Sequence, residues 1–225
     1  MQPRTIKSFV LRTGRVSNRQ QQGLDQWLAN YIMPEPLTAW DLSAEFGRTA
    51  DTVVEIGFGM GASLLTMAKM QPNVNFLGIE VHLAGIGSLV ADLHDESVTN
   101  VRVAPYDAVE VFKHCLADNS LQGVQIFFPD PWPKLRHHKR RLIQTAFIDM
   151  LVQKIKIGGF IHCATDWENY AEHIHTVLST QPALRNQEAD GGYSPRPETR
   201  PLTKFEQRGT RLGHGVWDLI FIRER

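Results

Sequence analysis

Short apolar runs alternate along this chain with segments in which apolar residues recur every three or four positions. The apolar runs predict buried strands, and the spaced segments predict amphipathic helices. Strands are predicted at residues 52–56, 75–80, 101–104, 124–128, 159–165 and 216–222, and helices at residues 23–31, 83–95, 108–117 and 167–180, with two more after the first strand and after residue 134. This alternation favours an α/β fold with a mostly parallel sheet.

The predicted connections also indicate how the strands are ordered. Strand, glycine turn, helix and strand over residues 52–80 form one right-handed βαβ unit. The whole pattern predicts a Rossmann-like sheet of order 3-2-1-4-5, with helices on both faces and residues 216–222 as a C-terminal edge strand. Residues 181–201 are predicted to be a loop. We expect a mobile basic arm at residues 1–22 and a single domain at residues 23–225.

Composition narrows the class of protein. The 225 residues are 42% hydrophobic, which suffices for one sizeable core. There is no membrane-spanning apolar stretch and no signal-peptide pattern, so we expect a soluble cytoplasmic protein. Cys115 and Cys163 are predicted to be reduced core thiols. No histidine pair has the spacing of a metal site, so no metal is expected.

Charge is balanced overall but unevenly placed. Residues 1–24 carry five Lys or Arg and no acid, whereas residues 75–130 carry eight acids and two Lys or Arg. Basic patches beside an acidic pocket are compatible with a polyanionic partner that reaches a site for a cationic cofactor. The basic arm could contact RNA or could be an ordinary solvated tail.

A glycine-rich turn follows the first predicted strand. Residues 52–61 run from an apolar strand through Glu55 into the alternating glycines Gly57 and Gly59. Glycine lets a ligand approach the backbone, and the next helix directs free amides there. Glu80, at the end of the second strand, can accept hydrogen bonds from ribose hydroxyls. The turn therefore predicts a nucleoside-cofactor site.

The glycine spacing alone leaves the cofactor open, because it also fits a dinucleotide-binding turn. Glu55 lies two residues before Gly57. Its carboxylate would repel a pyrophosphate but would suit the sulfonium and ammonium groups of S-adenosylmethionine. The sequence therefore favours S-adenosylmethionine over NAD, with a plain tight turn as the structural alternative.

The fourth predicted strand runs into a proline-rich segment, residues 129–134. Three prolines at alternate positions are expected to hold an extended backbone and to remove amide donors. Beside Asp130 and Trp132, such a segment could receive a flat base that carries N–H donors. A turn with a core tryptophan is the structural alternative. Asp107, after the third strand, could contact adenine, cap the next helix, or do both.

A basic run comes next. Seven of the eight residues at 134–141 are Lys, Arg or His, and they are predicted to open a helix that carries Phe147 and Leu151. Cations at a helix N-terminus oppose its macrodipole, and phosphate binding would offset that cost. A solvated charged face is the alternative.

The fifth strand ends at Asp166. Because strands four and five are neighbours in the predicted order, Asp130 and Asp166 should flank one pocket. Two carboxylates could share a proton, or they could accept from the two donor groups of a guanine edge. Residues 201–209 are also rich in side chains that bind bases and phosphate.

Four motifs in this order resemble the bacterial tRNA (guanine-N7-)-methyltransferases, a family of class I methyltransferases that use S-adenosylmethionine. The resemblance spans residues 52–222 and implies methylation of N7 of the guanosine at position 46 of the tRNA variable loop. The motifs are Glu55-x-Gly57-x-Gly59-x-Gly61, Pro129-Asp130-Pro131-Trp132-Pro133-Lys134, Arg136-His137-His138-Lys139-Arg140-Arg141 and Thr203-Lys204-Phe205-Glu206.

The resemblance also implies roles for individual residues, with Asp130 as the catalytic residue. S-adenosylmethionine would be held by Glu55, Gly57, Gly59, Glu80, Asp107 and Asp130. The target nucleotide would be contacted by Lys134, Asp166, Thr203, Lys204, Phe205 and Glu206. The RNA would be bound by Arg136, His137, His138, Lys139, Arg140 and Arg141.

Two other functions fit parts of the sequence. An NAD-dependent oxidoreductase would explain the glycines but would leave Asp130 and the basic run without a role. A non-catalytic RNA-binding module would use the basic run. However, Asp130 and Asp166 would repel phosphate and weaken its binding to RNA. The resemblance implies tRNA as the partner, and no membrane or obligate protein partner is evident from the sequence.

Overall fold

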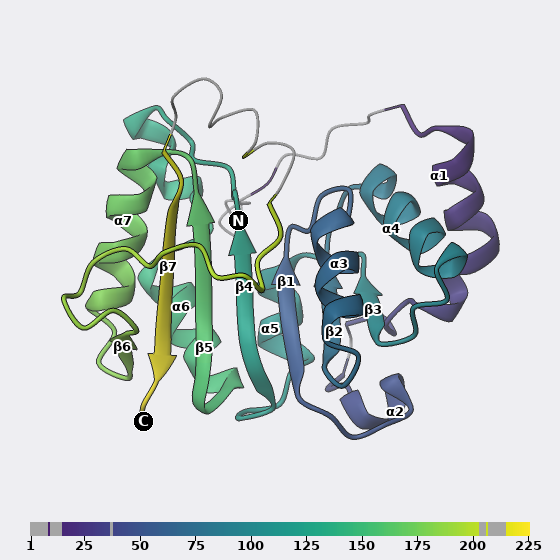
Figure 1. Cartoon of the computed structure of the whole chain (residues 1–225), viewed down its shortest axis with the longest axis horizontal. Helices are drawn as coiled ribbons and strands as arrows, with labels where there is room; N and C mark the ends of the chain where they lie inside the picture. Colours follow the sequence, from purple (N-terminus) through teal and green to yellow (C-terminus); the bar gives the residue numbers. More distant parts are fainter. Residues whose placement is uncertain (1–8, 10–14, 37, 203–205, 207–214) are drawn as a thin grey trace, which may run out of the picture.

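The centre of the structure is a sheet whose strands run in the order β3-β2-β1-β4-β5-β7-β6 (Figure 1). The computed structural model describes residues 9, 15–36, 38–202, 206 and 215–225, and the elements given below belong to this part of the chain. Strands β1 to β5 are parallel, so the predicted order 3-2-1-4-5 is confirmed. The strands are β1 (Thr52–Ile56), β2 (Asn75–Ile79), β3 (Val101–Ala104), β4 (Leu121–Phe127), β5 (Ile155–Thr165), β6 (Leu184–Asn186) and β7 (Trp217–Arg223).

Helices cover the sheet on both faces, which explains why β1 and β2 are buried at every position. Val53 on β1 packs with the helices α3 (Ala62–Met70) and α4 (Leu83–Asp95) in one core cluster. Its neighbour Val54 packs on the opposite face with α5 (Ala108–His114), α6 (Thr145–Lys154) and α7 (Glu168–Ser179). Figure 1 shows these two helical layers in front of and behind the sheet.

The N-terminal region differs from the prediction. Helix α1 (Asn18–Gln22) continues into a π-helical turn, η1 (Gly23–Trp27), and a 3₁₀ turn, η2 (Leu28–Asn30), where a plain helix was expected. Gly23 lies so close to α4 that a Cβ there would be 2.2 Å from the Gly87 carbonyl oxygen, and Arg19 forms ion pairs with acids of α4. Residues 18–22, the last part of the predicted arm, therefore pack against α4. Residues 1–8 and 10–14 of the predicted arm lie outside the described residues.

The C-terminal part of the sheet also needs a correction. Strand β7 pairs antiparallel with β5, as an added strand should, but it is not the edge. Strand β6 pairs antiparallel with the outer side of β7. The prediction of an uninterrupted loop at residues 181–201 was therefore wrong at β6. This strand is only three residues long, which leaves too few positions for a periodic signal.

The basic run does not open a long helix. Residues Leu135–Arg140 form a 3₁₀ helix, η3, and four residues separate it from α6. The backbone leaves the helical conformation at Arg141, whose guanidinium donates to the carbonyl of Pro131, at 3.0 Å, and to the side chain of Asn169, at 2.7 Å. The run therefore does not oppose the α6 macrodipole, and that argument for phosphate binding was wrong.

Several smaller expectations can be compared with the structure. Cys115 and Cys163 are buried and free, as predicted. Trp40 and the short helix α2 (Leu42–Phe46) cover the core ahead of β1. Across the described ranges, no helix combines the length and apolar character needed to cross a membrane.

Candidate active site

A cavity opens at the carboxyl ends of the parallel strands. Its walls come from four connections: the turn after β1 at Gly57, the end of β2 at Glu80, the start of α5 at Asp107, and the segment after β4 at Asp130. These residues are up to 73 positions apart in the chain, yet they meet because parallel strands end at the same edge. The structure therefore brings together four of the residues predicted to hold the cofactor.

The glycine turn has open space around it, and of its two predicted cofactor residues Gly57 lines the described cavity whereas Gly59 does not. Gly57 and Gly59 have φ angles of 75° and 58°, in the left-handed region that favours glycine. No described atom lies within 4 Å of a Cβ built at either position. By contrast, a Cβ at Gly85 of α4 would lie 2.0 Å from the Gly59 carbonyl oxygen, so α4 seals the turn from behind. This cradle has space for a ligand on its cavity side.

Glu80 is built into the same turn. Its carboxylate accepts the backbone N–H groups of Gly59 at 3.0 Å, Val81 at 2.7 Å and His82 at 3.0 Å. The side chain is buried and lines the cavity. A carboxylate has about four acceptor positions, so one is left for a ligand hydroxyl.

Glu55 does not form a charged lip, which corrects the sequence argument. It is 3% exposed, and among the described residues it is not part of the cavity wall. Burial, and secondarily the charge of Glu80, raises the pKa of Glu55 to about 8. Its carboxyl group is therefore mostly protonated at neutral pH. The argument that Glu55 repels a pyrophosphate was wrong.

Asp107 caps the next helix, as considered from the sequence, and it also faces the cavity where an adenine contact was considered. Its side chain accepts the backbone N–H of Val109 at 3.0 Å and so caps α5. It also lines the cavity. A carboxylate can do both because a cap uses only part of its acceptor capacity.

The segment after β4 turns sharply, although its prolines predicted an extended backbone. Phe128 and Trp132, each followed by proline, have φ angles of 50° and 44°. Such conformations cost about 1–3 kcal/mol each and persist only where the surroundings enforce them. The Phe128 N–H still donates to Ala164 of β5, at 2.7 Å. The turn carries Asp130, which is exposed and lines the cavity.

Asp166 lies on the neighbouring connection. It is the first residue after β5, and β5 is paired in parallel with β4 through Phe127 and Ala164. Its side chain is exposed. Among the described residues, Asp130 forms part of the cavity wall and Asp166 does not. The prediction that Asp130 and Asp166 flank one pocket is thus supported by the described cavity wall for Asp130 alone.

The residues of the basic run differ in their exposure and in their contacts. Lys134, Arg136 and Lys139 are exposed. Arg140 stacks over the indole of Trp132, with its guanidinium carbon 4.0 Å from the ring centroid. Arg141 is 3% exposed, and besides its two hydrogen bonds its guanidinium lies over the Tyr170 ring. In this structure the charge of Arg141 is engaged inside the protein, so its position gives no support to the predicted RNA contact.

The fourth motif is only partly described. Thr203, Lys204 and Phe205 lie outside the described residues. Glu206 is 5% exposed, and its carboxylate forms a bidentate ion pair with Arg200. The expectation that Glu206 contacts the target nucleotide is not supported by this position.

Sequence reasoning missed several residues of the cavity wall. Tyr106 directly precedes Asp107, and Phe127 is the last residue of β4, so their places at the ends of β3 and β4 were a usable signal. Leu142 and Phe9 also line the cavity, but neither belongs to a motif. Arg200 was missed as well, because a lone arginine in a predicted loop carries no pattern.

The fold is that of the class I methyltransferases. The structure is similar to that of the aminoglycoside resistance methyltransferase NpmB1, with a TM-score of 0.56 and 14% identity over 83% of this chain and 94% of that one. The family described as "Putative methyltransferase" matches residues 49–219.

Closer relatives give the family. A tRNA (guanine-N(7)-)-methyltransferase of Legionella pneumophila (strain Corby) is 67% identical, over 98% of this chain and 99% of the relative. One from Shewanella oneidensis is 56% identical over 98% and 92%. The chain belongs to the tRNA (guanine-N(7)-)-methyltransferase family.

Proposed function

We propose that this protein transfers a methyl group from S-adenosylmethionine to N7 of a guanosine in tRNA, and that the target is position 46 of the variable loop. The observation that carries the proposal is the single cavity that joins the glycine cradle to Asp130. Because tRNA is the substrate, the protein acts in the cytoplasm.

The residues of the cavity fit the cofactor. Gly57 and Gly59 leave open space where a nucleoside can approach the backbone. Glu80 retains one acceptor position for a ribose hydroxyl, and Asp107 offers a further carboxylate oxygen. When bound, S-adenosylmethionine supplies a methyl group on a positively charged sulfur.

Asp130 provides what the methyl transfer needs from the protein. Guanine N7 has an in-plane lone pair and no proton, so its attack requires no base at that atom. Positive charge then develops on the guanine ring. In the proposed mechanism, the Asp130 carboxylate accepts from the N1 and N2 edge of guanine, and this interaction strengthens as the charge develops.

Binding of tRNA involves the exposed part of the basic run. Lys134, Arg136 and Lys139 are exposed and follow Asp130 within nine positions of the chain, so phosphates can reach them. Arg140 adds a guanidinium stacked on Trp132. Asp166, exposed at the end of the strand next to β4, would contact the target nucleotide.

The function is tested with radiolabelled S-adenosylmethionine and unmodified tRNA, followed by digestion and identification of the labelled nucleoside. We expect 7-methylguanosine, and we expect a tRNA with adenosine at position 46 to accept no label. Label in another nucleoside would overturn the reaction assigned here, and label at another guanosine would overturn the position. Calorimetric titration with S-adenosylmethionine and NAD provides a separate test of the cofactor.

A further inference from the structure

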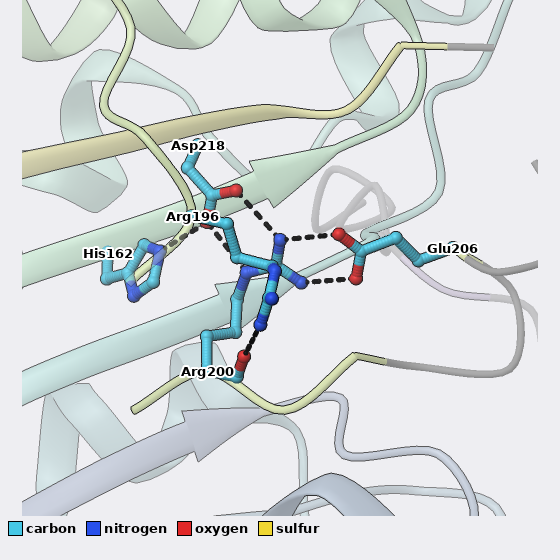
Figure 2. A network of polar contacts seen from close by, with 5 residues as sticks. All are labelled: His162, Arg196, Arg200, Glu206 and Asp218. Carbon is cyan, nitrogen blue, oxygen red and sulfur yellow. Dashed lines mark hydrogen bonds and ion pairs between the residues drawn. The ribbon is translucent and has the colours of Figure 1, made fainter. Parts of the chain in front are cut away.

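A buried arginine lies next to the cavity wall. Arg200 is 1% exposed, and Figure 2 shows its guanidinium between two carboxylates that approach from different sides. Asp218 accepts from Nε at 2.7 Å and from Nη2 at 2.8 Å. Glu206 accepts from Nη1 at 2.7 Å and from Nη2 at 2.9 Å.

The cluster is anchored in the sheet. Asp218 is part of β7, opposite Ala164 of β5, and its Oδ1 also contacts Nε2 of His162 at 2.7 Å. The imidazole of His162 in turn meets the ring of Phe127 edge to face, with centroids 4.9 Å apart. Figure 2 also shows Arg196, whose Nη1 donates to the carbonyl of Arg200 at 2.8 Å. Both the side chain and the backbone of Arg200 are therefore held in place.

The guanidinium of Arg200 lies beside two aromatic rings that belong to the cavity wall. Its central carbon lies 5.8 Å from the ring centroid of Phe127 and 5.7 Å from that of Phe128. Both rings line the cavity, and Phe128 has the strained left-handed backbone that begins the turn to Asp130. A charged group with fixed hydrogen bonds thus lies against the residues that direct Asp130 into the cavity.

We propose that Arg200 is a positioning residue for the methyl transfer, and that Glu206 acts through Arg200 rather than on the nucleotide. This inference rests on the proposed function. Arg200 and its two carboxylates hold Phe127 and Phe128, and so keep the strained turn in the conformation that places Asp130. A buried ion pair adds little stability over a well-packed apolar core, so stability alone gives weak grounds for such a cluster.

The first test is Arg200→Lys, which keeps the positive charge but loses the planar fork that joins two carboxylates. We expect the single-turnover rate at saturating cofactor to fall about tenfold or more, because small displacements of a catalytic group have effects of this size. The affinity for tRNA should stay within about threefold. Hydrogen exchange of the Phe128 amide, now bonded to Ala164, should become faster.

A matched control is Arg102→Lys. The guanidinium of Arg102 is half-buried and donates to the Glu45 carbonyl at 2.8 Å, and this arginine is not part of the cavity wall. Its variant should keep the wild-type rate. If Arg200→Lys also methylates at the wild-type rate with unchanged Phe128 exchange, Arg200 has a purely structural role.

The second test separates the two roles of Glu206. If Glu206 acts through Arg200, the two substitutions disturb the same interaction. The fold-decrease in methylation rate of the double variant Glu206→Gln, Arg200→Lys should then be smaller than the product of the fold-decreases of the two single variants. Multiplicative losses, or a loss of tRNA affinity in Glu206→Gln with a normal rate, would overturn this part of the proposal. Hydrogen exchange reports on Arg200 even if the wild-type protein fails to methylate tRNA, so the two proposals can fail separately.

Discussion

The carboxylate of Glu80 accepts the backbone N–H of Gly59 at 3.0 Å and so joins the end of β2 to the glycine turn after β1. Two further amides donate to the same carboxylate. The turn is therefore held in shape by the protein itself. A ligand that enters the cavity has less conformational entropy to remove than it would in a flexible loop.

The glycines of this turn should respond differently to substitution. Gly57 and Gly61 both have positive φ, so alanine strains the backbone at either position. Gly57→Ala in addition places a methyl group in open space at the cavity wall, so we expect it to weaken S-adenosylmethionine binding. Gly61→Ala places a Cβ 2.6 Å from that of Leu89, and such overpacking costs roughly 1–3 kcal/mol of stability. Calorimetry and urea unfolding measure the two effects. If Gly61→Ala weakened binding of S-adenosylmethionine more than Gly57→Ala, the assignment of the cofactor site to this cavity would be wrong.

Asp130 should be the residue on which turnover depends most. Asp130→Asn keeps the shape but removes the charge, and we expect methylation to fall by roughly a hundredfold, by analogy with the loss of one oxyanion-hole donor. Folding should be preserved, because the side chain is exposed. The measurement is single-turnover methylation of tRNA.

Asp118→Asn is a suitable control for Asp130, since Asp118 is an exposed acid whose Oδ1 lies 2.6 Å from Nζ of Lys154, away from the cavity. This variant should methylate normally. A near-normal methylation rate for Asp130→Asn would contradict the assignment of Asp130 as the catalytic residue, and Asp166 would become the residue to test.

Substitutions of two adjacent arginines should have different effects, one on RNA binding and the other on stability. Arg140→Ala removes a guanidinium stacked on Trp132 at the surface, so tRNA binding should weaken and the slope of its salt dependence should fall by roughly one unit. Arg141→Ala leaves two acceptors without their buried donor, so it should lower stability by about 1–3 kcal/mol. Filter binding over a range of salt and urea unfolding distinguish these results.

The reverse pattern, with Arg141→Ala stable and deficient in tRNA binding, would show that Arg141 leaves its buried site when RNA binds. An unchanged salt slope for Arg140→Ala would make Arg140 part of an ordinary solvated face.

Glu55 should make stability depend on pH. Its pKa is raised from 4.5 to about 8 in the folded protein, chiefly by burial. Between these values the unfolded chain has released the proton that the folded protein still holds, so the free energy of unfolding should decrease as pH rises. The slope for one such group is about 1.4 kcal/mol per pH unit. Urea unfolding of the wild type and Glu55→Gln from pH 5 to 8 should show this loss only in the wild type. Parallel curves would mean that Glu55 is ionised when buried.

The sequence by itself determined the sheet order and the end of the sheet at which the site forms. Buried strands read as continuous apolar runs, and parallel strands joined by helices must end at one edge. Gly57, Glu80, Asp107 and Asp130 could therefore be assigned to one cavity from their positions after successive strands. These assignments needed only local pattern and topology.

Only the tertiary structure decided which charges face the cavity and which are buried. Glu55, Arg141 and Glu206 belong to motifs whose residue types suggest ligand contacts, yet each is buried and the two last are paired inside the protein. Arg200 belongs to no motif, and it lies against Phe127 and Phe128. The direction of a side chain depends on turns such as the left-handed one at Phe128 and on partners far away in the sequence. Local sequence does not contain that information, because packing between distant segments settles it.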